Sequence, residues 1–267
     1  MRKDRKIIIV GGHEQACMIL DYLIENKCDV ALCIARQDDN GHDSIFPSLI
    51  ARARKYDIPT LQPKKLNPPQ VLSVVKHIKP DIVLSLQNNM IFGEEWLRIM
   101  DERLGIVNVH YAPLPKYGGY WPEMWAIWNG ETEFAVTMHY VAKGIDAGPI
   151  IAQSHFDIQP LETRKSLYEK STTYCSEMLK ENFEIVFDAR VPGTKQDESN
   201  RTYFPKSLPN DGYLDLSWPS ETQSRFIRAI SFPGFVGPKI KIGGQVISLL
   251  EEDIPFFAPI KISYRND

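Results

Sequence analysis

The first half of the chain alternates short apolar runs with amphipathic stretches. The apolar runs are continuous, which is typical of strands buried on both faces of a parallel sheet. Between them, apolar residues recur at helical spacing, as at Met18, Ile19 and Leu23. Strands that alternate with helices indicate βαβ units. The pattern predicts strands at residues 6–10, 29–35, 58–61, 81–86 and 106–110, and helices at about 15–25, 46–56, 68–78 and 93–100.

In the second half of the chain, the pattern of apolar and polar residues predicts a different order of elements. It predicts a helix over 120–130, consecutive strands at 134–141 and 149–158, a long helix over 162–187, a polar linker at 193–202 and a helix over 220–230. Gly243-Gly244, between apolar runs at 239–242 and 245–250, is a hairpin turn signal. We therefore expect an α/β fold: a domain with a parallel or mixed sheet over residues 1–191, and a small, mainly β module over 192–267.

The composition and net charge of the chain argue against several classes of protein function. The chain has 267 residues, a net charge of −3 and a sequence pI of about 6.1. Extended nucleic-acid contacts need a basic face, so this balance argues against nucleic acid as a partner. No apolar run is long enough to cross a membrane. The first apolar run, Ile7 to Val10, is too short for the hydrophobic region of a signal peptide. The four cysteines lack metal-ligand spacing. We expect a cytoplasmic enzyme without a metal and, as a prior, a homodimer.

The stretch 105–148 carries the candidate chemistry. Asn108 and His110 alternate with apolar residues on the strand 106–110, so they project to one side. Pro113 and Pro115 end this strand and start an irregular loop. Asp146, before Ala147-Gly148, is a candidate partner for His110. Polar side chains at a strand end before a loop are placed like an active site. The alternative is structural: a strand-end cap and a hydrogen-bonded buried imidazole.

Gly11-Gly12, after the first strand, invites a dinucleotide-binding interpretation. That motif needs a third glycine and an acidic residue further on, and neither is evident here. A Gly-Gly pair in such a turn is usually a matter of backbone geometry.

Taken together, these residues resemble the folate-dependent formyltransferases. The match covers Asn108-X-His110, Leu114-Pro115 and the run 146–149, Asp-Ala-Gly-Pro. The strand 135–140 and the tail 150–153 also look like that family. The resemblance implies a Rossmann-like catalytic domain and N10-formyltetrahydrofolate as cosubstrate. The segment Asp211 to Pro219 resembles the entry to the C-terminal module of the larger members.

The resemblance also implies roles for individual residues. Asn108 would donate to the formyl oxygen, His110 would take part in proton transfer, and Asp146 would orient the imidazole and accept a relayed proton. Folate contacts are implied at Asn89, Met90, Ile91, Tyr120, Ala142, Lys143, Gly144 and Ile145, and acceptor contacts at His13, Trp121 and Trp125.

The chain departs from the family pattern near its catalytic loop. Members commonly carry Ser where this chain has Ala112, and Arg where it has Gly118 and Tyr120. The early phosphate loop of the glycinamide-ribonucleotide branch does not match the sequence at His13. The family's contacts to the folate tail and to the acceptor near this loop therefore do not carry over to these positions.

The acceptor decides the function. The stretch 118–122, Gly-Gly-Tyr-Trp-Pro, looks most like formyltransferases acting on nucleotide-linked amino sugars. We expect a GDP- or dTDP-linked sugar of the perosamine or 4-amino-4,6-dideoxyglucose type, used for surface polysaccharide such as O-antigen. Three alternatives stay open: a methionyl-tRNA formyltransferase-like enzyme, a formyltetrahydrofolate hydrolase, and a catalytically silent folate-binding module.

Overall fold

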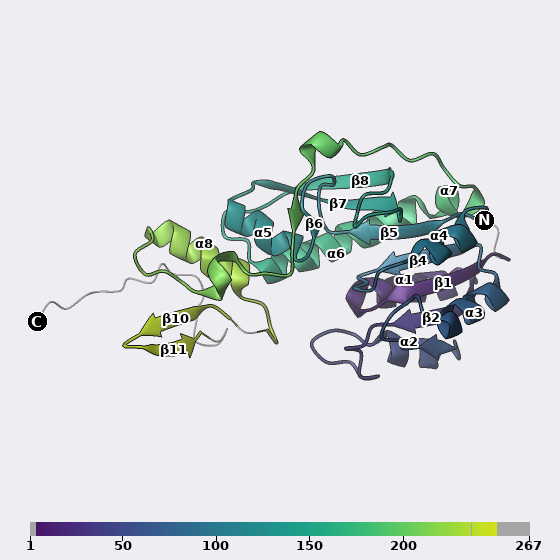
Figure 1. Cartoon of the computed structure of the whole chain (residues 1–267), viewed down its shortest axis with the longest axis horizontal. Helices are drawn as coiled ribbons and strands as arrows, with labels where there is room; N and C mark the ends of the chain where they lie inside the picture. Colours follow the sequence, from purple (N-terminus) through teal and green to yellow (C-terminus); the bar gives the residue numbers. More distant parts are fainter. Residues whose placement is uncertain (1–3, 236, 250–267) are drawn as a thin grey trace, which may run out of the picture. The chain divides into compact units, whose positions relative to one another are not determined.

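The computed structural model describes residues 4–235 and 237–249 of the chain. A seven-stranded sheet has the strand order β3-β2-β1-β4-β5-β7-β8 (Figure 1). Its strands are β1 Lys6–Gly11, β2 Asp29–Ala35, β3 Thr60–Leu61, β4 Ile82–Leu86, β5 Ile106–His110, β7 Glu133–Tyr140 and β8 Ile150–Asp157. The pairs from β3 to β5 are parallel, whereas β7 runs antiparallel to β5. The predicted α/β class with a parallel or mixed sheet is confirmed.

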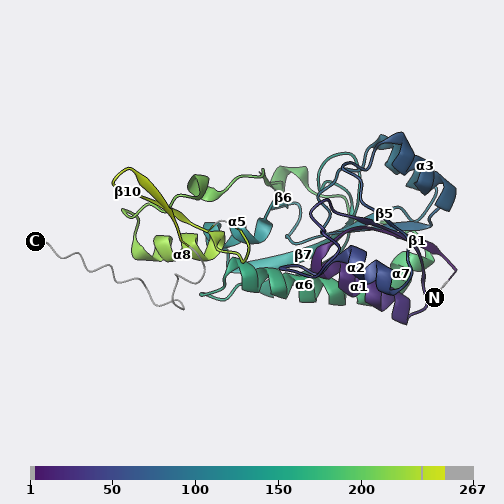
Figure 2. The ribbon, with the colours of Figure 1, turned by 90° about the horizontal axis from the view of Figure 1, so that it is seen from below.

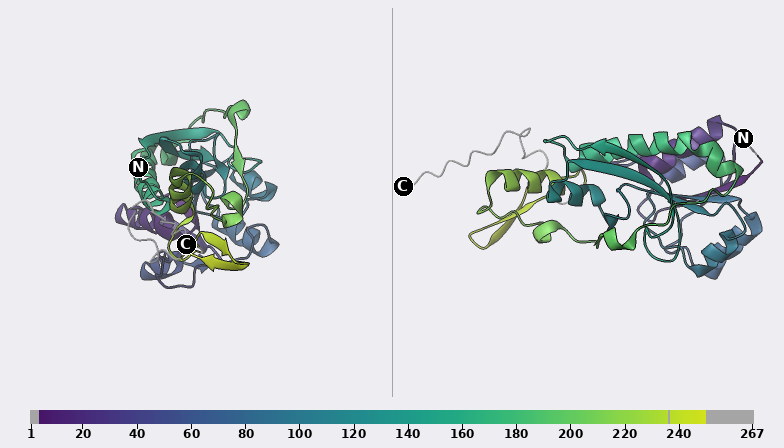
Figure 3. Two further views of the ribbon diagram at one scale, coloured as in Figure 1. Left: turned by 90° about the vertical axis from the view of Figure 1, so that its left-hand side faces the viewer. Right: turned by 90° about the horizontal axis from the view of Figure 1, so that it is seen from above.

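Helices cover both faces of this sheet. Figure 2 shows α3 on one face of the strands and α1 on the other, and the right-hand view of Figure 3 agrees. The helices are α1 His13–Glu25, α2 Leu49–Lys55, α3 Pro69–Ile78, α4 Glu94–Met100, α5 Pro122–Asn129, α6 Arg164–Glu181, α7 Phe183–Asp188 and α8 Ser220–Ile230. Short 3-10 turns lie at Glu198–Asn200 and Pro209–Gly212.

The inner strands β1 and β4 are mostly apolar because each face of the sheet there is buried under helices. Ile8 and Val10 of β1 pack in one core with Val75 of α3 and Trp96 of α4. The alternate residues Ile7 and Ile9 are equally buried. This two-sided burial leaves the strand ends as the part of the sheet from which polar side chains can reach solvent.

The chain divides into two compact units, each built from separate segments. The first comprises the described residues up to Gly118, with Ala135–His155 and Ser171–Thr202. The second comprises Gly119–Phe134, Phe156–Lys170 and the described residues from Tyr203 onward. This grouping interleaves along the sequence, whereas the sequence predicts one contiguous boundary after residue 191. The division into 1–191 and 192–267 stays a prediction about folding domains.

In the second unit, α5 and α8 share an aromatic contact. Trp128 lies 5.5 Å from Phe226 between ring centroids, and Trp218 lies 5.3 Å from the same ring. The hairpin predicted at Gly243-Gly244 is confirmed: both glycines have positive φ between the antiparallel strands β10 Lys239–Ile242 and β11 Gln245–Ser248. Leu250, the predicted end of that strand, lies outside the described residues. A further two-stranded pair joins β6 Gly118–Gly119 to β9 Tyr203–Phe204.

Three predicted helices differ in their limits. The helix predicted at 162–187 is two helices, separated at Asn182, whose side-chain amide donates to the Met178 carbonyl. The helix predicted from residue 46 begins at Leu49, because the Ser48 hydroxyl accepts from Ala51 and caps it. The helix predicted from residue 120 begins at Pro122, since Trp121 has a φ of 53° and lies outside it.

The polar stretch 193–202 is not a free linker, contrary to the sequence prediction. Thr194 forms a β-bridge with Ile150, and the two residues exchange backbone hydrogen bonds. Gln196 is only 5% exposed. Most of the stretch is exposed, as its polar composition suggests, but the buried Gln196 side chain donates to backbone carbonyls of the first unit.

Candidate active site

The carboxyl end of β5 presents the two polar residues singled out by the sequence. Asn108 and His110 are partly exposed, while Ile106, Val107 and Val109 between and before them are buried. Strand alternation therefore places both side chains on one side, as predicted. This end of the sheet is where ligands bind in open α/β folds.

Asp146 lies beside the same strand end. Its Oδ2 atom is 3.8 Å from Nε2 of His110, and its Oδ1 atom is 3.8 Å from Nε2 of His139 on β7. The side chains of His110 and Asp146 are 13% and 14% exposed. The structure thus brings together the three residues predicted to be catalytic and adds His139 to them.

His110 has a defined hydrogen bond to the loop that follows it. Its Nε2 atom lies 3.0 Å from the Tyr117 carbonyl oxygen. A carbonyl only accepts, so Nε2–H donates to it. At 3.8 Å, the carboxylate of Asp146 acts on His110 through its charge rather than through a hydrogen bond.

The Asp146 turn is held by close backbone packing and by two distant side chains. A Cβ atom at Gly148 would lie 1.7 Å from the Tyr140 carbonyl oxygen, so only glycine fits there. Gln196 donates to the carbonyls of Asp146 and Gly148, at 2.8 and 2.7 Å. Arg201 donates to the Ile145 carbonyl at 2.6 Å. These contacts hold the backbone of the turn that carries the Asp146 carboxylate.

A second network holds the loop after β5. The Thr137 hydroxyl donates to the Ala112 carbonyl at 2.6 Å, and Gln153 donates both to that hydroxyl and to the Leu114 carbonyl. The Leu114–Pro115 peptide bond is cis. Thr137 and Gln153 thus shape the loop that carries Tyr117. The sequence did not single out Thr137 or Gln153. It offered one indication of their importance, because both lie in segments that resemble the formyltransferases.

The two segments implied to contact folate lie in the first unit and carry exposed apolar residues. Ile91 is 61% exposed and Ile145 is 40% exposed. Lys143 lies 3.6 Å from Glu94 in an ion pair, which joins the loop 142–145 to the start of α4. Asn88, which the sequence did not single out, shapes the 89–91 segment through two hydrogen bonds to the Met90 backbone.

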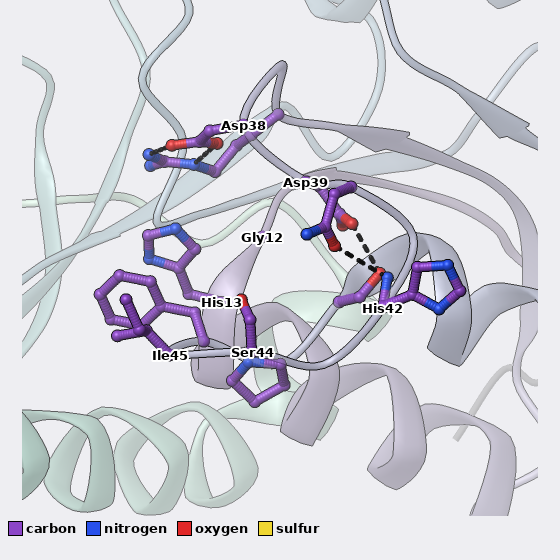
Figure 4. A pocket seen from close by; sticks show the side chains of 12 residues that line it. Gly12, His13, Asp38, Asp39, His42, Ser44 and Ile45 are labelled. Atoms are coloured by element: carbon purple, nitrogen blue, oxygen red, sulfur yellow. Dashed lines mark hydrogen bonds and ion pairs between the residues drawn. The ribbon is translucent and has the colours of Figure 1, made fainter. Parts of the chain in front are cut away.

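His13 lines a pocket at the carboxyl ends of β1 and β2 (Figure 4). Its ring stacks on Phe46 at 3.9 Å between centroids and 4° between planes. Burial, together with the charge of Arg36, lowers the pKa of His13 to about 4, so the ring is neutral at pH 7. Arg36 forms a two-pronged ion pair with Asp38, which lowers the pKa of that carboxyl.

The charged side chains that line this pocket determine which kind of ligand group it can bind. Its lining also includes Asp39, His42 and Ser44. The Arg36 guanidinium is already paired with Asp38, and Asp39 accepts from Ser48 and Ile50. With its cation paired and two carboxylates present, this pocket suits a polar, uncharged group better than a phosphate.

Tyr120, Trp121 and Trp125 belong to the second unit and are half-buried there. The Trp125 ring stacks on Phe204 at 4.7 Å. The Trp121 ring lies 5.3 Å from the guanidinium of Arg164, which is itself buried and paired with Glu123. Their predicted contacts with folate or acceptor stay predictions.

The described part of the chain, residues 4–235 and 237–249, contains no helix long and apolar enough to cross a membrane. Within the same residues, no group of three or more His, Cys, Asp or Glu side chains is arranged to hold a metal ion.

Known proteins share both the sequence pattern and the fold. The family model described as "Formyl transferase" matches residues 5–182. The methionyl-tRNA formyltransferase of Thermotoga maritima is 32% identical over 233 residues, which are 86% of this chain and 74% of that protein.

Solved structures with the same fold include three N-formyltransferases. WlaRD, a sugar 3N-formyl transferase studied with dTDP and 5-N-formyl-THF, has a TM-score of 0.72 at 24% identity, covering 90% of this chain and 83% of that one. An N-formyltransferase from Helicobacter canadensis, in complex with folinic acid and dTDP-3-aminofucose, has a TM-score of 0.71 at 24% identity, covering 90% and 85%. A 4-N formyltransferase from Francisella tularensis has a TM-score of 0.73 at 17% identity, covering 92% and 96%.

At these identities the solved structures establish the fold and no more. The family model covers more than half of the chain, and the Thermotoga maritima relative exceeds 30% identity. This chain therefore belongs to the formyl transferase family and is an N-formyltransferase.

Proposed function

We propose that this enzyme transfers the formyl group of N10-formyltetrahydrofolate to the amine of a nucleotide-linked amino sugar. The observation that carries the proposal is the meeting of Asn108, His110 and Asp146 at the carboxyl end of β5 in a formyl transferase fold. An amide donor, an imidazole and a carboxylate are the groups that this acyl transfer uses.

The reaction needs a polarised formyl carbonyl and a route for one proton. The amine nitrogen attacks the formyl carbon, and Asn108 donates to the oxygen that becomes negative. His110 stabilises that oxygen and takes part in proton transfer, while the carboxylate of Asp146, 3.8 Å from its Nε2 atom, would orient the imidazole and accept a relayed proton. The carbon–nitrogen bond to folate then breaks, the folate nitrogen gains a proton and the amine loses one.

The folate site is proposed along the segments 89–91 and 142–145. Their exposed Ile91 and Ile145 side chains offer apolar surface for a flat ring, and the Lys143–Glu94 ion pair joins the second segment to the start of α4, which follows the first. Backbone groups at Asn89, Ala142 and Gly144 would provide hydrogen bonds, and Tyr120 a further contact. The solved complexes of related fold with 5-N-formyl-THF and folinic acid support a formyl-folate cosubstrate.

An amino sugar linked to a nucleotide is supported as acceptor by two solved relatives, which hold dTDP or dTDP-3-aminofucose. The acidic net charge of −3 favours a small acceptor over a long phosphate backbone. We assign acceptor contacts to His13, Trp121 and Trp125. The finer proposal is a GDP- or dTDP-linked 4-amino sugar of the perosamine or dideoxyglucose type, destined for surface polysaccharide such as O-antigen, handled by a cytoplasmic homodimer.

Methionyl-tRNA is the second candidate acceptor, because the Thermotoga maritima enzyme shares 32% identity with this chain. Extended contact with transfer RNA gives strong salt dependence and needs a basic surface. The two acceptors are therefore separable by activity and by the effect of salt on it.

The deciding experiment incubates the full chain with 10-formyltetrahydrofolate and one acceptor at a time: amino-sugar nucleotides, or initiator methionyl-tRNA. Mass spectrometry of the products follows the added formyl group. We expect formylation of an amino-sugar nucleotide. Efficient formylation of the tRNA alone would contradict the sugar assignment, formate release without an amine would indicate a hydrolase, and folate binding without turnover would indicate a silent module.

A further inference from the structure

His139, a residue on β7 that the sequence did not single out, has a defined role for each ring nitrogen. Its side chain is 2% exposed. Nδ1 lies 2.9 Å from the Tyr140 carbonyl oxygen, and Nε2 lies 3.0 Å from Nδ2 of Asn108. Because a carbonyl only accepts, Nδ1 carries the hydrogen and donates it. In the neutral ring, Nε2 is then left with a lone pair and accepts from the Asn108 amide.

The neutral state of this ring has a physical cause. Burial lowers the pKa of His139 to about 4, against the opposing effects of the Asp146 charge and the Tyr140 hydrogen bond. The charged groups facing the ring are Asp146 on the loop before β8 and, when protonated, His110 on β5. At pH 7 the ring is neutral. In its hydrogen bond with Asn108, the amide therefore donates and Nε2 of His139 accepts.

We propose that His139 is a positioning residue that sets the orientation of the Asn108 carboxamide. An amide side chain can present either its NH₂ group or its oxygen to a neighbour, and the two ends have nearly the same shape. The lone pair of Nε2 selects the NH₂ end. One of its hydrogens is held by His139, and the second is the donor that the proposed function assigns to the formyl oxygen.

Without that acceptor, the Asn108 amide is free to turn. A turned amide would direct its own oxygen toward the developing oxyanion. The partial negative charge of the amide oxygen would then repel the oxyanion instead of stabilising it. His139 therefore acts on the rate through Asn108 without touching the substrate. This inference rests on the proposed role of Asn108, but the state of the ring can be measured independently of activity.

The first test is NMR of the ring nitrogens in the full, ¹⁵N-labelled chain at pH 7. Long-range proton–nitrogen correlations distinguish a protonated nitrogen from one with a lone pair, and the signals missing in His139→Gln identify the residue. We expect Nδ1 protonated and Nε2 unprotonated. Protonation of Nε2, in either the charged or the other neutral form, would overturn the inference whatever the enzyme's acceptor proves to be.

The second test compares three variants. His139→Phe keeps a flat ring but removes the acceptor, and we expect it to lower kcat about 10²-fold with little change in the folate KM. His139→Gln offers an oxygen near the place of Nε2, and we expect it to restore most of that loss. His77→Gln, at an exposed histidine of α3, is the matched control and should behave like wild type.

A double-mutant comparison separates positioning from a general structural effect. In an Asn108→Ala background, His139→Phe should cost less than about threefold further, because no amide remains to be oriented. The inference would be overturned if the fold-losses in kcat of the two single variants multiply in the double variant. A wild-type kcat in His139→Phe would also overturn it. If instead Asn108→Ala is fully active, the proposed role of Asn108 fails while the NMR result stands.

Discussion

Gln196 donates its side-chain amide to the backbone carbonyl of Asp146 at 2.8 Å, from a position 50 residues later in the chain. The same amide donates to the Gly148 carbonyl, and the side chain is only 5% exposed. A residue from an apparently featureless polar stretch therefore ties down the turn that carries a candidate catalytic carboxylate.

Replacing Gln196 by Leu should loosen the Asp146 turn, because one buried and one partly buried carbonyl would lose this donor. We expect kcat to fall about tenfold and the free energy of unfolding to fall by about 1–3 kcal/mol. Steady-state kinetics and urea unfolding measure the two effects. Gln70→Leu, at an exposed position of α3, is the control. Unchanged kcat in the Gln196 variant would show that the turn does not depend on this contact.

Substitutions at the strand-end site should separate chemistry from folding. We expect His110→Ala and Asp146→Asn each to lower turnover about 10²-fold or more, and Asn108→Ala about 10²–10³-fold. Circular dichroism should show an unchanged fold, since the side chains are partly exposed. Asp101→Asn, a carboxylate whose side chain is 81% exposed, controls for the loss of charge. Near-normal turnover in Asp146→Asn would contradict the assignment of the turn.

Trp121→Ala should raise the Michaelis constant for the acceptor more than that for folate, if Trp121 forms a wall for the sugar or base. The Arg164 guanidinium lies against the Trp121 ring, which favours one ring position. Initial-rate kinetics with each substrate varied in turn measure the difference. Acceptor binding should weaken only modestly between low and physiological salt. An equal rise of both constants would place Trp121 outside acceptor recognition.

The Glu123–Arg164 ion pair in the second unit should be worth more to stability than a surface pair. Both side chains are buried, at 7% and 5% exposure, so removing one leaves the other charged and unpaired. We expect Glu123→Ala to lower the free energy of unfolding by about 3–5 kcal/mol. Glu169→Gln, in the exposed pair with Lys165, should cost less than about 1 kcal/mol. Equal losses in urea unfolding would contradict this ranking.

Acid should destabilise the protein partly through His139. Its pKa is lowered from 6.5 to about 4 on folding, so below pH 6.5 the unfolded chain takes up a proton that the folded chain does not. The stability from the neutral ring is present above pH 6.5 and is lost as pH falls toward 4, by at most about 3 kcal/mol. Denaturant unfolding of His139→Gln should show a shallower decline over this range than wild type. An identical decline would mean that the ring does not titrate this way.

Most local elements, and the placement of the candidate residues Asn108 and His110, could be predicted from the sequence. Continuous apolar runs predicted the buried strands, and β2 and β5 begin and end where the pattern placed them. Strand alternation put Asn108 and His110 on one side, and Gly243-Gly244 predicted the hairpin. Such features depend on neighbours within a few residues, so the sequence contains all the necessary information.

Contacts between distant segments were decided only by the tertiary structure. His139 lies in an apolar strand and reads as a core residue, until the pairing of β7 with β5 puts it opposite Asn108. Gln196 reads as part of a linker until the chain folds back onto the Asp146 turn. Long-range hydrogen bonds of this kind have no signature in spacing or composition, because either partner alone is an ordinary polar residue. The sequence by itself thus determined most strands of the main sheet and indicated Asn108, His110 and Asp146 as candidates, whereas only the tertiary structure decided which buried groups contact these candidates.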